Sequence, residues 1–268
     1  MLEFLEWTAW PMTKPPVYGA FHLAFSGIGI AAAIAAAFLL RKKNTPKQTD
    51  RIVLSAGVML AVFELYKQMF YYHVLYDGEY YWWIFPFQLC SIPIYFCLIA
   101  PFLKEGKLKD ALYDFLGTYT LFSGAVVFVS PDGMLFEYWT LTLHSFLWHI
   151  ILVFIGLYLG FSGRTGATKK GFLRTVPIYV ALCAAALAIN FIFWERSGGN
   201  INMFYLGPKI SSQVVFGDIS SLYGWYANMP LYMACTTLGA FLVYLPFTKR
   251  NRKSQAKTGE KTLPNDVV

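Results

Sequence analysis

Charged residues are scarce in this sequence. Asp, Glu, Lys and Arg make up 14% of its 268 residues, whereas a soluble domain carries about 25%. Hydrophobic residues reach 57% and aromatic residues 19%, which leaves too little polar surface to cover a water-soluble fold. The many aromatics and the absence of a short repeat exclude a disordered or fibrous chain. The chain is therefore predicted to be a polytopic membrane protein.

Cysteine is also rare, and its positions exclude two further classes. The four residues Cys90, Cys97, Cys183 and Cys235 all lie inside apolar stretches, and no CxxC motif occurs. A disulfide framework and a structural zinc site are therefore not expected. We expect no metal and no cofactor.

The apolar stretches predict one all-α membrane helical bundle with seven transmembrane helices of ~20 residues each. Residues 1–16 alternate apolar and acidic side chains and are predicted to lie along the membrane interface. Residues 17–248 form the transmembrane domain, and residues 249–268 form a basic tail that we expect to be disordered. The predicted spans are 17–40, 52–75, 83–103, 112–129, 138–159, 172–194 and 224–247.

Lys and Arg alternate between the connections, and this alternation predicts the orientation. Eighteen of the 22 basic residues fall beside alternate connections and in the C-terminal tail, whereas the other side collects only Lys14, Arg196 and Lys209. By the positive-inside rule the N-terminus is outside and the C-terminus is cytoplasmic. The net charge of +7 then reflects topology, so nucleic acid is not an expected partner. Membrane lipids are, and we expect a multi-pass protein of the bacterial plasma membrane.

Several polar side chains fall within the predicted spans, mostly in the outer half of the bundle. Such groups are costly in lipid, so they are expected to face the interior and are candidates for function. Structural interpretations remain open: Glu64 and Lys67 have the spacing of an ion pair, and intramembrane Asn residues often bond between helices. The candidate residues are Cys90, His144, His149, Gln88, Glu64, Lys67, Asn190 and Asn228.

Cys90 combined with a histidine at similar depth indicates nucleophilic chemistry. A thiol reacts as its thiolate, and an imidazole can take its proton. His144 and His149 are separated by roughly 140° on a helix, so at most one faces a given partner and a shared metal is not expected. Pro86 and Pro93 flank Cys90 and predict a break in the third span that leaves the Trp82 and Leu89 carbonyls without helical partners.

Four short motifs resemble the YwaF-like family of bacterial integral membrane proteins, which is related to the eukaryotic transmembrane protein 164. Residues 86–91 read PFQLCS, 131–133 PDG, 145–149 SFLWH and 202–206 NMFYL, and the resemblance spans about residues 50–245. It implies an acyltransferase acting on ether phospholipids, with Cys90 as the acyl-accepting nucleophile and His149 as the histidine of the fifth span. Gln88 stands where the family commonly has His.

The leading hypothesis is a membrane acyltransferase that moves fatty-acyl groups between phospholipids through a Cys90 thioester. His149 is the general base with His144 as substitute, Gln88 or Asn228 steadies the oxyanion, and Glu64 and Lys67 orient the site or bind a head group. The alternative is a small-solute transporter or a seven-helix receptor whose outward polar pocket also includes Asn190. A scaffold without chemistry is the third possibility. Oligomeric state is not predicted.

Overall fold

Helices make up nearly all of the regular structure. The computed structural model describes residues 2–166, 170–209, 213 and 216–258, with side chains only to Thr248 in the last range. Within these residues the one extended pairing is an isolated bridge between Pro11 and Tyr138. The helices are α1 (Leu2–Trp7), α2 (Ala20–Leu40), α3 (Pro46–Phe70), α4 (Ile92–Ile99), α5 (Lys107–Phe115), α6 (Leu121–Val126), α7 (Trp139–Phe161), α8 (Gly171–Ile192), α9 (Phe216–Tyr223) and α10 (Trp225–Thr258).

In the described part of the chain, five helices are long and apolar enough to cross a membrane, which confirms the multi-pass prediction. They are α2, α3 with the π-turn that continues it to Leu75, α7, α8 and the part of α10 up to Thr248. Large apolar side chains on their outer faces are exposed, such as Ile28 and Leu39 of α2, as contact with lipid requires. Half of the predicted tail lies outside the described residues: α10 continues through residues 249–258, and residues 259–268 are not described.

The other two predicted spans are not continuous α-helices. In the third, a short 3₁₀ turn (Trp82–Ile84) is followed by non-helical backbone over residues 85–91, and α4 begins only at Ile92. The predicted break is confirmed, because Pro86 supplies no amide donor and Pro93 fits the first turn of a new helix. The Trp82 carbonyl is not left free, since it accepts from the Phe85 amide at 3.2 Å.

The fourth predicted span is one helical rod of three parts. Helix α5 runs into a π-turn (Leu116–Thr120), which runs into α6. At the π-turn, Gly117 leaves room for Thr165, since a Cβ at this position would lie 2.2 Å from the Thr165 hydroxyl oxygen. The extra backbone of a π-turn thus coincides with a close approach of the loop that follows α7.

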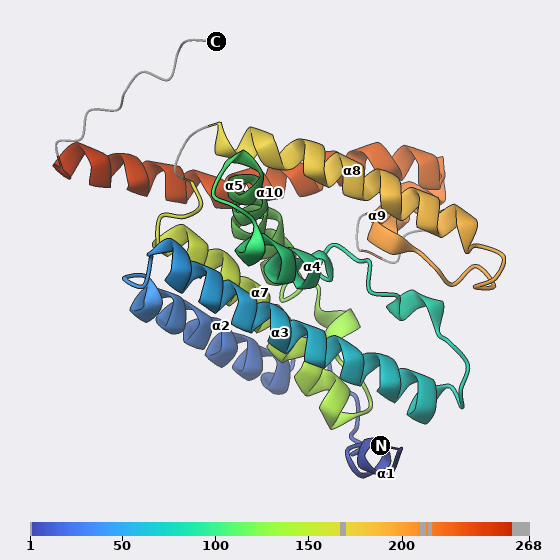
Figure 1. The fold of residues 1–268 in the computed structure, drawn as a ribbon. Helices are drawn as coiled ribbons and strands as arrows, with labels where there is room; N and C mark the ends of the chain where they lie inside the picture. The colour runs from blue at the N-terminus through green and yellow to red at the C-terminus, as the bar shows by residue number, and fades with distance from the viewer. Residues whose placement is uncertain (1, 167–169, 210–212, 214–215, 259–268) are drawn as a thin grey trace.

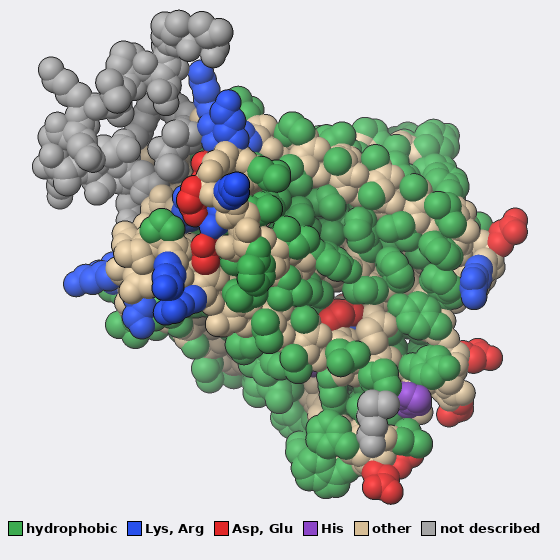
Figure 2. All heavy atoms as spheres, in the orientation of Figure 1, with side chains coloured by type: hydrophobic (Ala, Val, Ile, Leu, Met, Phe, Trp, Pro, Cys, Tyr) green, Lys and Arg blue, Asp and Glu red, His purple; other side chains and the backbone are tan. Residues whose placement is uncertain are grey.

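Basic residues gather at one end of the bundle, here called the basic end (Figure 2). At this end the Lys109 ammonium lies 2.8 Å from both Asp50 and Glu105, and Arg164 lies 2.8 Å from Glu105. These ion pairs join the start of α3, the α4–α5 connection and the loop after α7. The α4–α5 connection therefore reaches the same end as the ends of two long spans.

The other end, here called the opposite end, holds the connection between α6 and α7. There Lys14 lies 3.1 Å from Asp132, and the Tyr18 hydroxyl donates to the Val129 carbonyl at 2.6 Å. Helix α1 lies at this end too (Figure 1); its Leu5 is buried, while Phe4 and Trp7 are exposed. The α5–α6 rod and the connection that follows it therefore lead from one end of the molecule to the other.

Helix α7 is the centre of the bundle, in contact with α2, α3 and the α5–α6 rod (Figure 1). Small residues make these contacts close: Gly156 of α7 faces Leu121 of α6, and Gly124 of α6 faces Leu152 of α7. A second buried cluster joins α8 and α10 to the segment around Met203 and to residues 85–92. Residues 85–92 thus lie between this second cluster and the buried cluster formed by α3, α4 and α7.

Candidate functional site

Cys90 lies in the non-helical stretch just before α4. Its carbonyl accepts a hydrogen bond of 3.0 Å from the indole Nε1 of Trp148, on α7. Its thiol interacts electrostatically with Lys67 and Glu64. The break in the third span therefore brings the predicted nucleophile against α3 and α7 together.

Glu64 and Lys67 form the ion pair that their spacing predicts, with the Lys67 ammonium 2.9 Å from the Glu64 carboxylate. Glu64 is buried and also accepts from the Gln68 amide at 2.6 Å, while the same amide donates to the Ile84 carbonyl at 2.7 Å. Lys67 lies 5.8 Å from the centre of the Trp148 ring. The Glu64 carboxylate, which accepts hydrogen bonds from Lys67 and Gln68, thus lies next to the segment that carries Cys90. The Lys67 ammonium lies there too, beside the Trp148 indole.

The two histidines of α7 face different neighbours, as their five-residue spacing predicts. The His144 ring stacks on Trp148 at 5.6 Å, and its Nε2 lies 3.0 Å from the Phe63 carbonyl on α3. The His149 ring meets Phe128 edge-on at 6.4 Å, and its Nδ1 lies 2.7 Å from the Ser145 carbonyl of its own helix. His144 is therefore on the side of Trp148, and His149 on the side of the α6 end.

These bonds determine which ring nitrogen is available as a base. A carbonyl only accepts, so His144 carries its proton on Nε2 and His149 carries its proton on Nδ1. In the neutral rings the lone pair is then on Nδ1 of His144 and on Nε2 of His149. Each histidine keeps one basic nitrogen for chemistry.

Gln88 and Asn190 are both used to hold the segment Asn202–Leu206. Gln88 donates to the Asn202 carbonyl at 3.0 Å and accepts from the Phe204 amide at 2.9 Å. Asn190 donates to the Met203 carbonyl at 3.0 Å and accepts from the Met203 amide at 2.6 Å. Both predicted binding residues thus contact backbone of the sixth connection.

Asn228, on α10, differs from them. It is 2% exposed, and its side-chain oxygen has no hydrogen-bond partner among the described residues. A buried unpaired amide oxygen costs about 1–3 kcal/mol. Asn228 is therefore a predicted site residue with a buried acceptor that the described part of the fold leaves unpaired.

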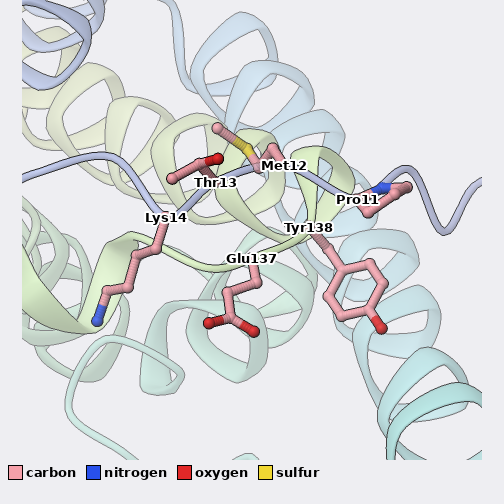
Figure 3. Close-up of a pocket in the computed structure, with 6 residues that line it drawn as sticks. All are labelled: Pro11, Met12, Thr13, Lys14, Glu137 and Tyr138. Atoms are coloured by element: carbon pink, nitrogen blue, oxygen red, sulfur yellow. The ribbon is translucent and has the colours of Figure 1, made fainter.

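A pocket of about 370 Å³ lies at the opposite end, away from Cys90. Figure 3 shows that the side chains of Lys14 and Glu137 extend in the same direction from the two segments, residues 11–14 and 137–138, that line the pocket. None of the predicted site residues line this pocket. Among the described residues, no three His, Cys, Asp or Glu side chains are grouped closely enough to hold a metal ion.

Sequence reasoning missed Trp148, Gln68 and Tyr205 as neighbours of the site. Gln68 lies one helical turn from Glu64, so its spacing alone was a signal. Trp148 belongs to the SFLWH motif, and its indole needs a partner when buried. Tyr205 packs on Trp83 at 5.5 Å, a contact across more than a hundred residues that no local pattern encodes.

The fold and the site define a class: a multi-pass helical membrane protein with a buried polar cluster around one cysteine. The chain belongs to the TMEM164 family, which it matches over residues 17–246. This match confirms the resemblance inferred from the motifs. Comparison with curated proteins and with solved structures gives no significant match.

Proposed function

We propose that this protein is an integral membrane acyltransferase that moves fatty-acyl groups between phospholipids through a thioester on Cys90. The observation that carries the proposal is the placement of Cys90: a family motif puts a thiol in irregular backbone, beside the buried Glu64–Lys67 pair and Trp148. Irregular backbone at membrane depth is tolerated only in the protein interior or against a cavity, and it is frequent at functional sites.

The reaction proceeds in two balanced steps. The Cys90 thiolate attacks the ester carbonyl of a donor phospholipid, the C–O bond breaks, and the leaving lysolipid oxygen takes the proton removed from the thiol. A hydroxyl of the acceptor lysolipid then attacks the thioester, the C–S bond breaks, and the hydroxyl proton returns to the thiol. No oxidant or cofactor enters either step.

The proposed general base is His149, through its Nε2, on the strength of the family motif, with His144 as substitute, through its Nδ1. The geometry favours His144, because its ring stacks on Trp148, which is bonded to Cys90, whereas the His149 ring faces Phe128.

Asn228 offers its amide N–H as a donor to the oxyanion. Lys67 provides a positive charge for the ester phosphate or the developing oxyanion. Gln88 and Asn190 hold the backbone of the segment Asn202–Leu206 in place.

The proposed topology has seven crossings, with the basic end in the cytoplasm and the protein in the bacterial plasma membrane. The ion pairs of the α4–α5 connection at the basic end support full crossings by residues 83–103 and 107–126. The positive-inside rule supports the orientation.

The test uses purified protein in vesicles that contain an acyl phospholipid and a labelled lysolipid. Cys90→Ser is expected to abolish transfer, and His149→Ala to slow it by a factor of about 10²–10⁴, the usual contribution of a general base. Cys235→Ser, an exposed cysteine, is the matched control. Full transfer by Cys90→Ser, or no transfer by the wild type across a broad lipid panel, would contradict the proposal.

A further inference from the structure

The segment Asn202–Leu206, here called the plug, is an irregular stretch buried in the bundle. It belongs to the long connection between α8 and α9, yet Met203 and Phe204 are fully buried and Leu206 nearly so. Connections normally run over the surface, because buried irregular backbone leaves amides and carbonyls unpaired. The plug therefore needs dedicated partners for its backbone.

Two side-chain amides supply those partners. Gln88 pairs with the carbonyl of Asn202 and the amide of Phe204, and Asn190 pairs with both polar groups of Met203. Each amide donates once and accepts once, which is the most economical way to satisfy a short irregular backbone. Gln88 precedes α4 and Asn190 is near the end of α8, so the plug is held from two sides.

The plug backbone is also strained. Phe204 and Tyr205 have φ values of 55° and 56°, in the left-handed region that favours glycine. This conformation is unfavourable for residues with a Cβ, because the Cβ comes too close to the following carbonyl oxygen. Such strain persists where the surroundings over-determine the conformation, and it concentrates at functional sites.

The plug lies against the stretch that carries the proposed nucleophile. Phe204 packs on Phe87 at 5.9 Å, and Tyr205 packs on Trp83 at 5.5 Å. Gln88 is two residues from Cys90, and Leu89 belongs to the same buried cluster as Met203, Phe204 and Leu206. The plug is thus packed against the residues that immediately precede Cys90.

We propose that Gln88 and Asn190 are positioning residues that hold the plug over Cys90, and that release of the plug admits an acyl lipid to the thiol. The purpose of this device rests on the proposed function, but its existence does not. The strained backbone at Phe204 and Tyr205 favours release of the plug. The four hydrogen bonds from the side-chain amides of Gln88 and Asn190 oppose its release. The balance between them sets how often Cys90 is accessible.

The test measures the rate at which N-ethylmaleimide alkylates Cys90 in protein that keeps no other cysteine (Cys97→Ala, Cys183→Ala, Cys235→Ala). Gln88→Leu and Asn190→Leu are each expected to raise this rate about tenfold. This corresponds to a decrease of about 1.4 kcal/mol in the free energy that favours the bound plug over the released plug. Gln88→Glu keeps the acceptor for the Phe204 amide and is expected to give an intermediate rate. Gln48→Leu, an exposed glutamine near the basic end, is the matched control and is expected to change nothing.

A second single-cysteine protein distinguishes release of the plug from general unfolding. It keeps only Cys97, which is fully buried against Gly57 of α3, and its alkylation is expected to stay slow in all variants. An unchanged rate at Cys90, or an equal rise at Cys90 and Cys97, would overturn the proposal. Because no transfer activity is measured, this result is independent of whether Cys90→Ser abolishes catalysis.

Discussion

Trp148 connects three parts of the candidate site through one side chain. Its Nε1 donates to the Cys90 carbonyl, its ring faces Lys67, and His144 stacks on it. Trp148→Phe keeps most of the ring but removes the donor, which leaves a buried carbonyl unpaired. We expect the free energy of unfolding to fall by about 1–3 kcal/mol, measured by thermal unfolding in detergent micelles. The exposed Trp7 is the control, and Trp7→Phe should leave the midpoint unchanged.

Lys109 is almost completely buried at the basic end, with two carboxylate partners. The carboxylates of Asp50 and Glu105, each 2.8 Å from the Lys109 ammonium, compensate the cost of burying its charge. Lys109→Met keeps the aliphatic length and removes the charge. We expect a loss of about 2 kcal/mol, less than the ~3–5 kcal/mol of fully buried pairs, because both partners are partly exposed. The exposed neighbour variant Lys107→Met should match the wild type in a denaturant or thermal titration.

Glu105 gives the same network a pH dependence in acid. The hydrogen bond from Lys109, together with Arg164, holds the pKa of Glu105 below its ordinary value of 4.5. A lowered folded-state pKa contributes stability above the unfolded value, and this contribution is lost as pH falls through the folded value. Wild type should therefore lose stability below about pH 4.5, and Lys109→Met should lose less over the same range. Equal slopes in the two proteins would contradict this assignment.

The contacts of single residues could be predicted from the sequence where polar side chains lie close together on one helix in apolar surroundings. Glu64 and Lys67 pair as their spacing predicts, and the two histidines diverge as helical geometry requires. The partners of Gln88 and Asn190 were not predictable, because they are backbone groups more than a hundred and about a dozen residues away. Side-chain polarity marks a residue as interior but does not identify what it bonds.

Helices α6 and α7 interlock through reciprocal glycine contacts. A Cβ on Gly156 would lie 2.5 Å from the Leu121 Cβ, and a Cβ on Gly124 would lie 2.7 Å from the Leu152 Cβ. Gly156→Ala and Gly124→Ala therefore force the helices apart, and overpacking of this kind costs about 1–3 kcal/mol. Gly27 of α2 has open space around its Cβ position, so Gly27→Ala is the matched control. Thermal unfolding in detergent checks the three variants, and equal midpoints would refute the interlock.

Whole elements were predictable where hydropathy is continuous. All five long spans coincide with helices, whereas the third predicted span is half irregular because of its prolines. The plug could not be foreseen as a buried element, since its five residues have no periodicity and lie in a connection. Its burial depends on amides from two other elements, which is tertiary information.

At the scale of the molecule, the two ends give a prediction about crossing. The Lys109 ion pairs place the α4–α5 connection at the basic end, with the start of α3 and the end of α7. The short α4 and the divided α5–α6 rod are therefore expected to be full crossings rather than a hairpin that enters and leaves on one side. Seven crossings put the N- and C-termini on different sides, as the positive-inside rule also requires.

Labelling of introduced cysteines tests this arrangement in a variant without native cysteines. Glu79→Cys and Asp132→Cys, at the opposite end, should react with a membrane-impermeant maleimide in intact bacterial cells. Lys42→Cys and Lys107→Cys, at the basic end, should react only after the membrane is permeabilised. Labelling of Lys107→Cys in intact cells while Lys42→Cys stays protected would reduce the crossings to five. Labelling of both basic-end positions in intact cells, with Glu79→Cys and Asp132→Cys protected, would instead reverse the predicted orientation.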